Sequence, residues 1–160
     1  MKKKLIVLGM VLLLTGSSEI FAFGLGIQFN GNAGEIFTPG VALTFKLDSV
    51  PLVFAANWYF GDDSEIGLTG DYWILNDKLV NVGSVPLNWF FGLGFYANAV
   101  FADEFAFNGG ARIPIGLNMF IAKKIEPFLQ IAPSFGVDLL PSIAASKIFF
   151  PISAGCRFWF

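Results

Sequence analysis

The chain has 160 residues, of which 55% are hydrophobic, and its formal net charge is -2. Its 20 phenylalanines are more than the core of an ordinary soluble domain of this size needs, so part of the chain must face something other than water. The mildly acidic balance excludes the basic surface of a nucleic-acid-binding protein.

The start of the chain has the three-part pattern of a secretory signal peptide. Lysines occupy positions 2–4, residues 5–14 are apolar, and small or polar residues follow up to Ala22. This apolar segment is too short to cross a hydrocarbon core of roughly 30 Å as a helix, so a retained anchor is the weaker alternative. We expect cleavage of residues 1–22 after Ala22, with Ser18 as a competing site, and one domain over residues 23–160.

Beyond Ala22, large apolar side chains recur at every second position, a pattern typical of β-strands with two unlike faces. Eight segments show it, at residues 23–30, 40–47, 52–60, 66–75, 87–98, 111–120, 126–138 and 150–160. A strand of about ten residues, tilted by about 40°, spans about 25 Å, the height of the apolar band of an outer-membrane barrel. The sequence therefore predicts an all-β fold, an eight-stranded antiparallel up-and-down transmembrane β-barrel.

Prolines complicate the last three predicted strands, because proline cannot donate a hydrogen bond to a β-ladder. They are Pro114, Pro127, Pro133 and Pro151. We expect bulges or strand ends at these positions, and the sequence leaves the strand register around them open.

The links between the strands alternate between the two ends of the barrel. If the barrel starts and ends in the periplasm, the outward links lie near residues 31–38, 61–65, 100–109 and 139–146, and the periplasmic turns near 48–51, 76–86 and 122–125. A turn as long as 76–86 departs from the short periplasmic turns usual in such barrels. The outward links and their flanks are acidic, with Glu35, Asp62, Asp63, Glu65, Asp103, Glu104 and Asp138. A divalent cation or a basic host surface would suit five of them, Asp62, Asp63, Glu65, Asp103 and Glu104, although solvated loop tips are the simpler interpretation.

The two faces of the predicted strands decide which side of the barrel meets lipid. One face is almost purely Leu, Ile, Val and Phe and carries no charge, whereas the other combines many Gly and Ala residues with charged ones. The charged residues on this second face are Lys46, Asp71, Arg112, Glu126 and Arg157. So many small residues fit a narrow lumen better than a solvated surface. We therefore expect the apolar face to meet outer-membrane lipid, and an exported soluble barrel of the lipocalin type is the alternative.

Two runs resemble a known family: LNWFFGLGFYANAV at residues 87–100 and GARIPIGLNMFIAKKIEPFLQIAPSFGV at 110–137. Together with the Phe-ended last strand, they are similar to the small, uncharacterised outer-membrane β-barrel proteins of spirochaetes, which themselves resemble the OmpA transmembrane domain. The similarity covers residues 87–137 well and the rest only by pattern. It implies an eight-stranded barrel in the outer membrane and no particular chemistry. The end of the chain, with Phe158 and Phe160, resembles the signal by which the barrel-assembly machinery recognises its clients.

The residue types present exclude several chemistries. The sequence has no histidine, which excludes Ser-His hydrolysis and histidine-based metal sites. Its single cysteine, Cys156, falls on the apolar face and is best interpreted as a small apolar residue. The G-x-G of FFGLGF opens no helix and indicates no nucleotide site. We expect no enzymatic activity, no cofactor and no metal.

The inward charges suggest pairs inside the lumen. If the last hairpin centres between residues 141 and 142, Glu126 lies opposite Arg157, near the periplasmic rim. Arg112 is placed to meet Asp71 across the lumen, with Lys46 lower down, although this second pairing is the weaker inference. Such pairs mostly stabilise and plug a barrel, and gating or proton handling is the alternative. The predicted function is a structural or surface-interaction role through short outer loops, for an unidentified surface or host ligand. The alternative is a narrow channel or carrier for small or apolar solutes.

Overall fold

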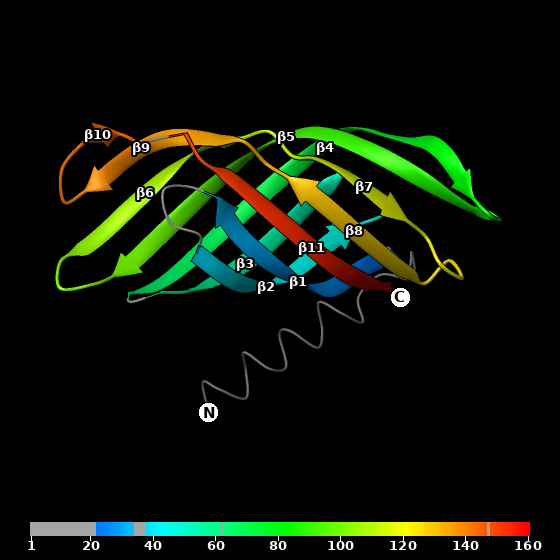
Figure 1. Ribbon diagram of the computed structural model, residues 1–160, viewed down its shortest axis with the longest axis horizontal. Coiled ribbons are helices and arrows are strands. Elements are labelled where there is room, and N and C mark those ends of the chain that lie inside the picture. The colour runs from blue at the N-terminus through cyan, green and yellow to red at the C-terminus, as the bar shows by residue number, and fades with distance from the viewer. Residues whose placement is uncertain (1–21, 34–37, 62, 147) are drawn as a thin grey trace, which may run out of the picture.

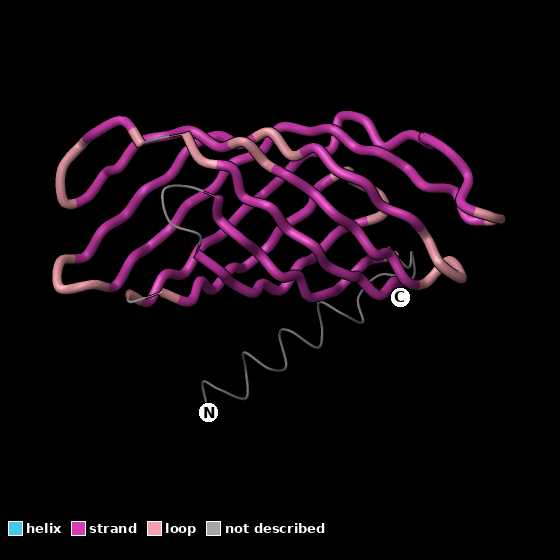
Figure 2. Tube along the Cα trace, in the orientation of Figure 1, coloured by secondary structure: helices cyan, strands magenta, loops and turns pink. Residues whose placement is uncertain are grey.

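The computed structural model describes residues 22–33, 38–61, 63–146 and 148–160. The expected signal peptide, apart from Ala22, lies outside these ranges, as do the loop residues Glu35 and Asp62. None of the described segments is a helix able to cross a membrane. Figure 2 shows strands joined by loops throughout the described part of the chain.

The described residues form one antiparallel sheet that closes into a barrel (Figure 1). Its strands are β1 (Phe23–Ala33), β2 (Thr38–Leu47), β3 (Leu52–Phe60), β4 (Ser64–Val82), β5 (Val85–Phe101), β6 (Phe105–Arg112), β7 (Ile115–Met119), β8 (Ile125–Ile131), β9 (Ser134–Leu140), β10 (Ala144–Ala145) and β11 (Phe150–Trp159). Since β6 continues into β7 and β8 into β9, the barrel has eight spans, with the short β10 paired to β9. The prediction of an eight-stranded antiparallel barrel is confirmed.

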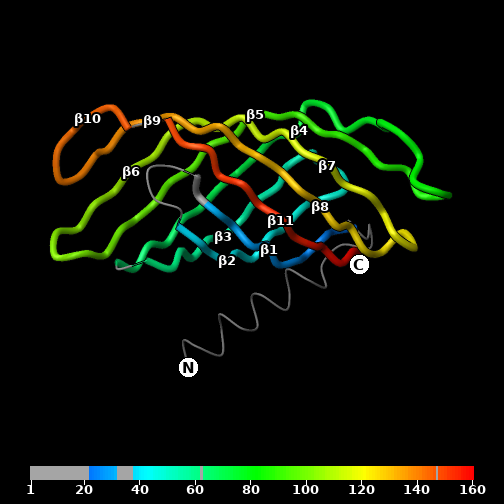
Figure 3. Tube along the Cα trace, in the orientation of Figure 1, coloured from blue at the N-terminus to red at the C-terminus, as the bar shows by residue number. Residues whose placement is uncertain are grey.

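Closure of the barrel depends on the pairing of β1 with β11. Gly26 lies opposite Arg157 of β11 on one side and opposite Thr44 of β2 on the other. Figure 3 shows the blue first strand beside the red last strand. β1 to β5, β7, β8 and β11 thus pair in a closed ring, in which backbone N–H and C=O groups find partners in neighbouring strands, as a hydrocarbon environment requires.

Two of the four strand prolines coincide with strand ends. β6 gives way to β7 at Ile113 and Pro114, and β8 gives way to β9 at Ala132 and Pro133. The ladder continues through the neighbouring groups, because the N–H of Ile113 donates to the C=O of Pro133 at 2.9 Å. The expected irregularity is therefore present at these two positions.

The other two prolines, Pro127 and Pro151, lie inside β8 and β11. The register of β8 with β11, and of β11 with β1, shows no shift at either residue. Neither proline forms a bulge, but each lies just past the end of one ladder, because β7 pairs with β8 only as far as Phe128 and β8 pairs with β11 only as far as Ile152. The expectation is confirmed for the ladder ends and is wrong for the bulges. A residue without an N–H thus stands where pairing stops on one side of the strand, as the chemistry of proline favours.

The predicted long turn at 76–86 is wrong, because β4 and β5 continue as a hairpin to a two-residue turn at Gly83 and Ser84. Gly83 has a φ of 64°, a left-handed conformation that glycine adopts without a Cβ penalty. Register shifts between Trp73 and Leu75 and between Lys78 and Val80 interrupt the alternation that marks a strand in the sequence. In Figure 1 this hairpin reaches beyond the other turns at its end of the barrel.

The outward link predicted at 100–109 is also shorter in the structure. β5 extends to Phe101 and β6 begins at Phe105, so only residues 102–104 connect them. Phe101 and Phe105 pair across the ladder, and their rings lie 5.6 Å apart. The small and polar residues of the FAFNGG stretch, residues 105–110, had concealed this strand.

Candidate functional site in the barrel lumen

A buried carboxylate, that of Glu126 on β8, organises the half of the lumen nearer to Phe23 and Phe160. Glu126 has no exposed surface, and strand register places it directly opposite Arg157 of β11. Arg157 Nη1 lies 3.2 Å from Glu126 Oε2, and Lys46 Nζ, on β2, lies 3.0 Å from Oε1. We call Lys46, Glu126 and Arg157 the charge cluster.

Two neutral donors complete the surroundings of this carboxylate. Asn118 of β7 donates from Nδ2 to Oε1 at 2.8 Å, and Trp159 of β11 donates from Nε1 to Oε2 at 2.9 Å. Glu126 therefore receives side chains from β7 and β11, which flank β8 in the sheet, and from β2, which lies beyond β1. Charge-assisted hydrogen bonds of this kind hold a buried carboxylate in its ionised form and in one position.

Aromatic rings cover the cations of the charge cluster. Lys46 Nζ lies 3.9 Å from the ring centroid of Trp73, and Arg157 Cζ lies 3.9 Å from that of Phe128. Trp73 stacks on Phe90, with 3.8 Å between the centroids. The distances from Lys46 to Trp73 and from Arg157 to Phe128 are both in the range of a cation–π contact. Side chains therefore occupy much of this half of the lumen, and a cavity of about 230 Å³ remains beside Lys46, Trp73 and Trp159.

Small residues on the facing strands make room for these rings. A Cβ at Gly116 of β7 would collide with the Phe90 ring and with the backbone oxygen of Leu129. Arg157 also donates from Nε to Thr44 Oγ1 at 3.1 Å. The many glycines on the inward face therefore leave space for large side chains inside a narrow barrel.

A second ion pair lies in the lumen, between Asp71 of β4 and Arg112 of β6. Arg112 Nε is 3.1 Å from Asp71 Oδ1, and both residues are almost fully buried. The structure thus places all five inward charges named from the sequence inside the barrel. Lys46, Glu126 and Arg157 form the charge cluster, and Asp71 and Arg112 form a separate ion pair.

Amide side chains form a further chain of contacts that the sequence did not reveal. Gln28 Nε2 donates to Asn30 Oδ1, and Asn30 Nδ2 donates to Asn57 Oδ1, both at 2.8 Å. Like Asn118 and Trp159, these residues occupy inward positions of the alternating pattern. That pattern was the available signal, but it did not indicate which inward residues meet across the lumen.

The last strand places Phe158 and Phe160 on the outside of the barrel. Phe158 is 53% exposed and Phe160 is 67% exposed. The N–H of Phe160 donates to the C=O of Phe23 at 3.0 Å, and the two rings stack with centroids 5.4 Å apart. Cys156 also lies on the outer face and is half-buried. The aromatic end of the chain is therefore tied to the start of β1.

The acidic residues of the outward links are not gathered into a cation site in the described ranges. There, no group of three or more Cys, Asp or Glu residues is arranged to hold a metal ion. Asp63, Asp103 and Glu104 are exposed. They supply negative charge at the end of the barrel opposite to Phe23 and Phe160.

All eight spans carry large apolar side chains on the outer face of the barrel wall, and exposed charges such as Asp77 and Lys78 lie on the projecting hairpin. Exposed large hydrophobic residues include Leu25, Ile27, Phe29, Leu43, Trp58, Leu68, Leu93, Phe95, Leu129 and Phe135. The buried polar residues all point the other way, into the lumen. This distribution is the inverse of a soluble barrel, and the lipocalin-type alternative does not fit it. The chain is an outer-membrane β-barrel whose apolar face meets lipid.

No family model and no curated protein sequence matches the chain. Among solved structures, the N-terminal β-barrel domain of Pseudomonas aeruginosa OprF is 15% identical, with 86% of this chain and 97% of that chain covered and a TM-score of 0.49. Neisserial surface protein A (NspA) is 14% identical, with 88% and 97% covered and a TM-score of 0.46. Ail, the attachment invasion locus protein of Yersinia pestis, is 11% identical, with 88% and 99% covered and a TM-score of 0.39. With identities this low, the similarity concerns the fold and no further property.

Proposed function

We propose that this protein is a closed, non-enzymatic outer-membrane barrel whose role is structural or is exerted by its outer end on a surface or host ligand. The observation that carries the first part is the charge cluster, in which Glu126 Oε1 and Oε2 are bound by groups from three strands. Eight strands leave an interior only wide enough for side chains. Here, Lys46, Arg157, Trp73 and Phe90 occupy it.

The surface role rests on the outer end of the barrel. Asp63, Asp103 and Glu104 are exposed there, on short links, and would suit a partner that presents basic groups. Links this short offer little area for a large adhesive interface. During biogenesis, Phe158 and Phe160 would serve as the recognition signal for the barrel-assembly machinery. The similarity of residues 87–137 to spirochaete-type barrels is a further part of this proposal.

Planar-bilayer recording of the refolded protein tests whether the lumen is closed. We expect no discrete conductance steps from the unmodified protein. We expect steps to appear when Glu126→Ala removes the residue that holds Lys46 and Arg157 in place. Glu104→Ala, in the exposed outer link, is the matched control and should stay silent. Steps in the unmodified protein that disappear in the Arg157→Ala or Arg112→Ala variant would overturn the proposal.

A narrow channel for small solutes is the second candidate, and one observation favours it. Within the described part of the lumen, Trp73 Nε1, Tyr96 Oη and Asn118 Oδ1 are buried without a hydrogen-bond partner. Buried polar atoms that lack a partner in the protein commonly bind ordered water. A file of such waters past the charge cluster would be the path of a channel, and the conductance of the unmodified protein decides between the two candidates.

A further inference from the structure

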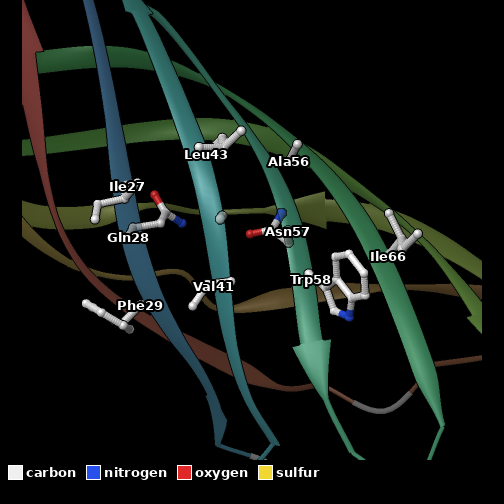
Figure 4. Close-up of a pocket in the computed structure, with 10 residues that line it drawn as sticks. Ile27, Gln28, Phe29, Val41, Leu43, Ala56, Asn57, Trp58 and Ile66 are labelled. Carbon is white, nitrogen blue, oxygen red and sulfur yellow. The ribbon is translucent and has the colours of Figure 1, made fainter.

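A hollow in the lipid-facing surface lies over the first four strands. It has a volume of about 400 Å³ and follows the outer face of β1, β2, β3 and β4 (Figure 4). Ala56 is the smallest outward side chain in it, and Ile27, Phe29, Leu43, Trp58 and Ile66 surround it. We call this hollow the exterior groove.

Strand register explains why the surface is hollow at this point. Ala56 lies opposite Leu43 on β2 and opposite Leu68 on β4, so a methyl group stands between two long side chains. The next outward residue on β3 is Trp58, which lies opposite Ile66. A small residue ringed by large ones leaves a depression as deep as the difference in their lengths.

The walls of the exterior groove are almost entirely apolar, with very few hydrogen-bonding atoms. Leu43 is 63% exposed and Trp58 is 55% exposed. The polar residues that border the groove, Gln28 and Asn57, point away from it and hydrogen-bond inside the lumen, where both are buried. A water molecule in the exterior groove would lack the two or more hydrogen-bonding partners that it needs.

The depth of the exterior groove in the membrane indicates which part of a lipid could occupy it. Ile27 lies near the middle of β1 and Ala56 at the middle of β3, away from both rims of the barrel. The groove is continuous with the apolar exterior that meets the hydrocarbon core of the membrane. At this depth lipid presents its acyl chains, whereas headgroups lie at the rims.

We propose that the exterior groove binds one lipid acyl chain and holds it in preference to the surrounding hydrocarbon. The bound chain gains dispersion contacts on several sides, whereas a lipid against a smooth barrel wall gains them on one. This inference goes beyond the proposed function and does not depend on whether the lumen conducts.

Trp58 makes the occupancy measurable. In detergent micelles, a phosphatidylcholine with brominated acyl chains quenches the fluorescence of a tryptophan that it touches. We expect Trp58 emission, identified by its loss in Trp58→Phe, to fall and to saturate near an equimolar ratio of lipid to protein. In Ala56→Phe, the new ring fills the groove and the saturable phase disappears.

The matched control is Ala111→Phe, since Ala111 is also an exposed alanine of the outer face but lies on β6, outside the groove. It should retain the saturable phase, and heat-modifiable gel migration shows that each variant is folded. Quenching that rises only in proportion to the brominated fraction, equally in the unmodified protein and in Ala56→Phe, would overturn the proposal. A dimer that Ala56→Phe dissociates would assign the groove to a second copy of the chain, and would also overturn it.

Discussion

Glu126 and Arg157 face each other across the β8–β11 ladder, with 3.2 Å between Oε2 and Nη1, and neither side chain reaches solvent. Glu126 is the only carboxylate in contact with the two cations of the charge cluster among the described residues. The cluster therefore depends more on Glu126 than on either cation. Substitutions of Glu126 should therefore destabilise the barrel more than substitutions of Lys46.

Replacing Glu126 should be the most damaging change in the lumen. Glu126→Gln leaves Lys46 and Arg157 buried beside each other without a counter-charge, and we expect a loss of about 3–5 kcal/mol in the free energy of unfolding. Urea titration of the barrel refolded in lipid vesicles, followed by tryptophan fluorescence, measures it. Glu104→Gln in the exposed outer link should change the stability by less than about 0.5 kcal/mol. Equal stabilities of the two variants would contradict the role given to Glu126.

Replacing Lys46 should cost less than replacing Glu126. After Lys46→Met, the carboxylate of Glu126 still receives Arg157, Asn118 and Trp159, so one buried pair with matched charges remains. Methionine also keeps most of the apolar stem that packs beside Trp73. The same urea titration compares the two variants. A Lys46→Met loss larger than that of Glu126→Gln would show that the ammonium, and not the carboxylate, holds the cluster together.

The Asp71–Arg112 pair should behave as a coupled unit. Either Asp71→Asn or Arg112→Met alone leaves a buried charge without its partner and destabilises the barrel. The double variant should cost less than the sum of the single losses, by about 0.5–3 kcal/mol. A double-mutant cycle of unfolding free energies measures this difference. Strict additivity would mean that the two groups do not interact in the folded barrel.

The cost of introducing a charge should depend on membrane depth, even for two outward residues of nearly equal exposure. Leu68, at 47%, lies in the middle of the barrel wall, and Val80, at 49%, lies on the projecting β4–β5 hairpin. We expect Leu68→Arg to cost about 2–4 kcal/mol in vesicles and Val80→Arg about 0–1 kcal/mol, because the penalty of a charge falls away from the bilayer centre. Similar costs at the two sites would contradict the placement of the hairpin outside the hydrocarbon.

The aromatic end of the chain should matter more for assembly than for stability. Phe160→Ala removes one exposed ring, and we expect a reduced amount of folded barrel in outer-membrane fractions with little change in the urea titration of the refolded protein. Phe135→Ala removes an outward ring of 50% exposure from β9 and serves as the control. Equal membrane levels of the two variants would contradict a recognition role for Phe160.

Period-two patterning predicted the spans and their inward faces because a strand exposes alternate residues to lumen and lipid. The opposition of Glu126 and Arg157 follows from counting residues outward from one hairpin. The contact of Lys46 with Glu126 could not be predicted in this way, since β2 and β8 are not neighbours in the sheet. Their meeting depends on the curvature of the barrel and on side-chain length. The projecting hairpin was missed because its two register shifts break the alternation.

The pairing of β1 with β11 has a kinetic consequence. Gly24 lies opposite Trp159, and the ladder continues to Ala33 opposite Phe150, so the closing seam joins the two ends of the barrel's sequence. Every other pairing between whole spans joins segments that follow each other along the chain or lie closer together in it. Contacts between distant segments carry the largest loop-closure entropy and form slowly. The seam should therefore be the last ladder to form during refolding, after the hairpins, and its completion should set the folding rate.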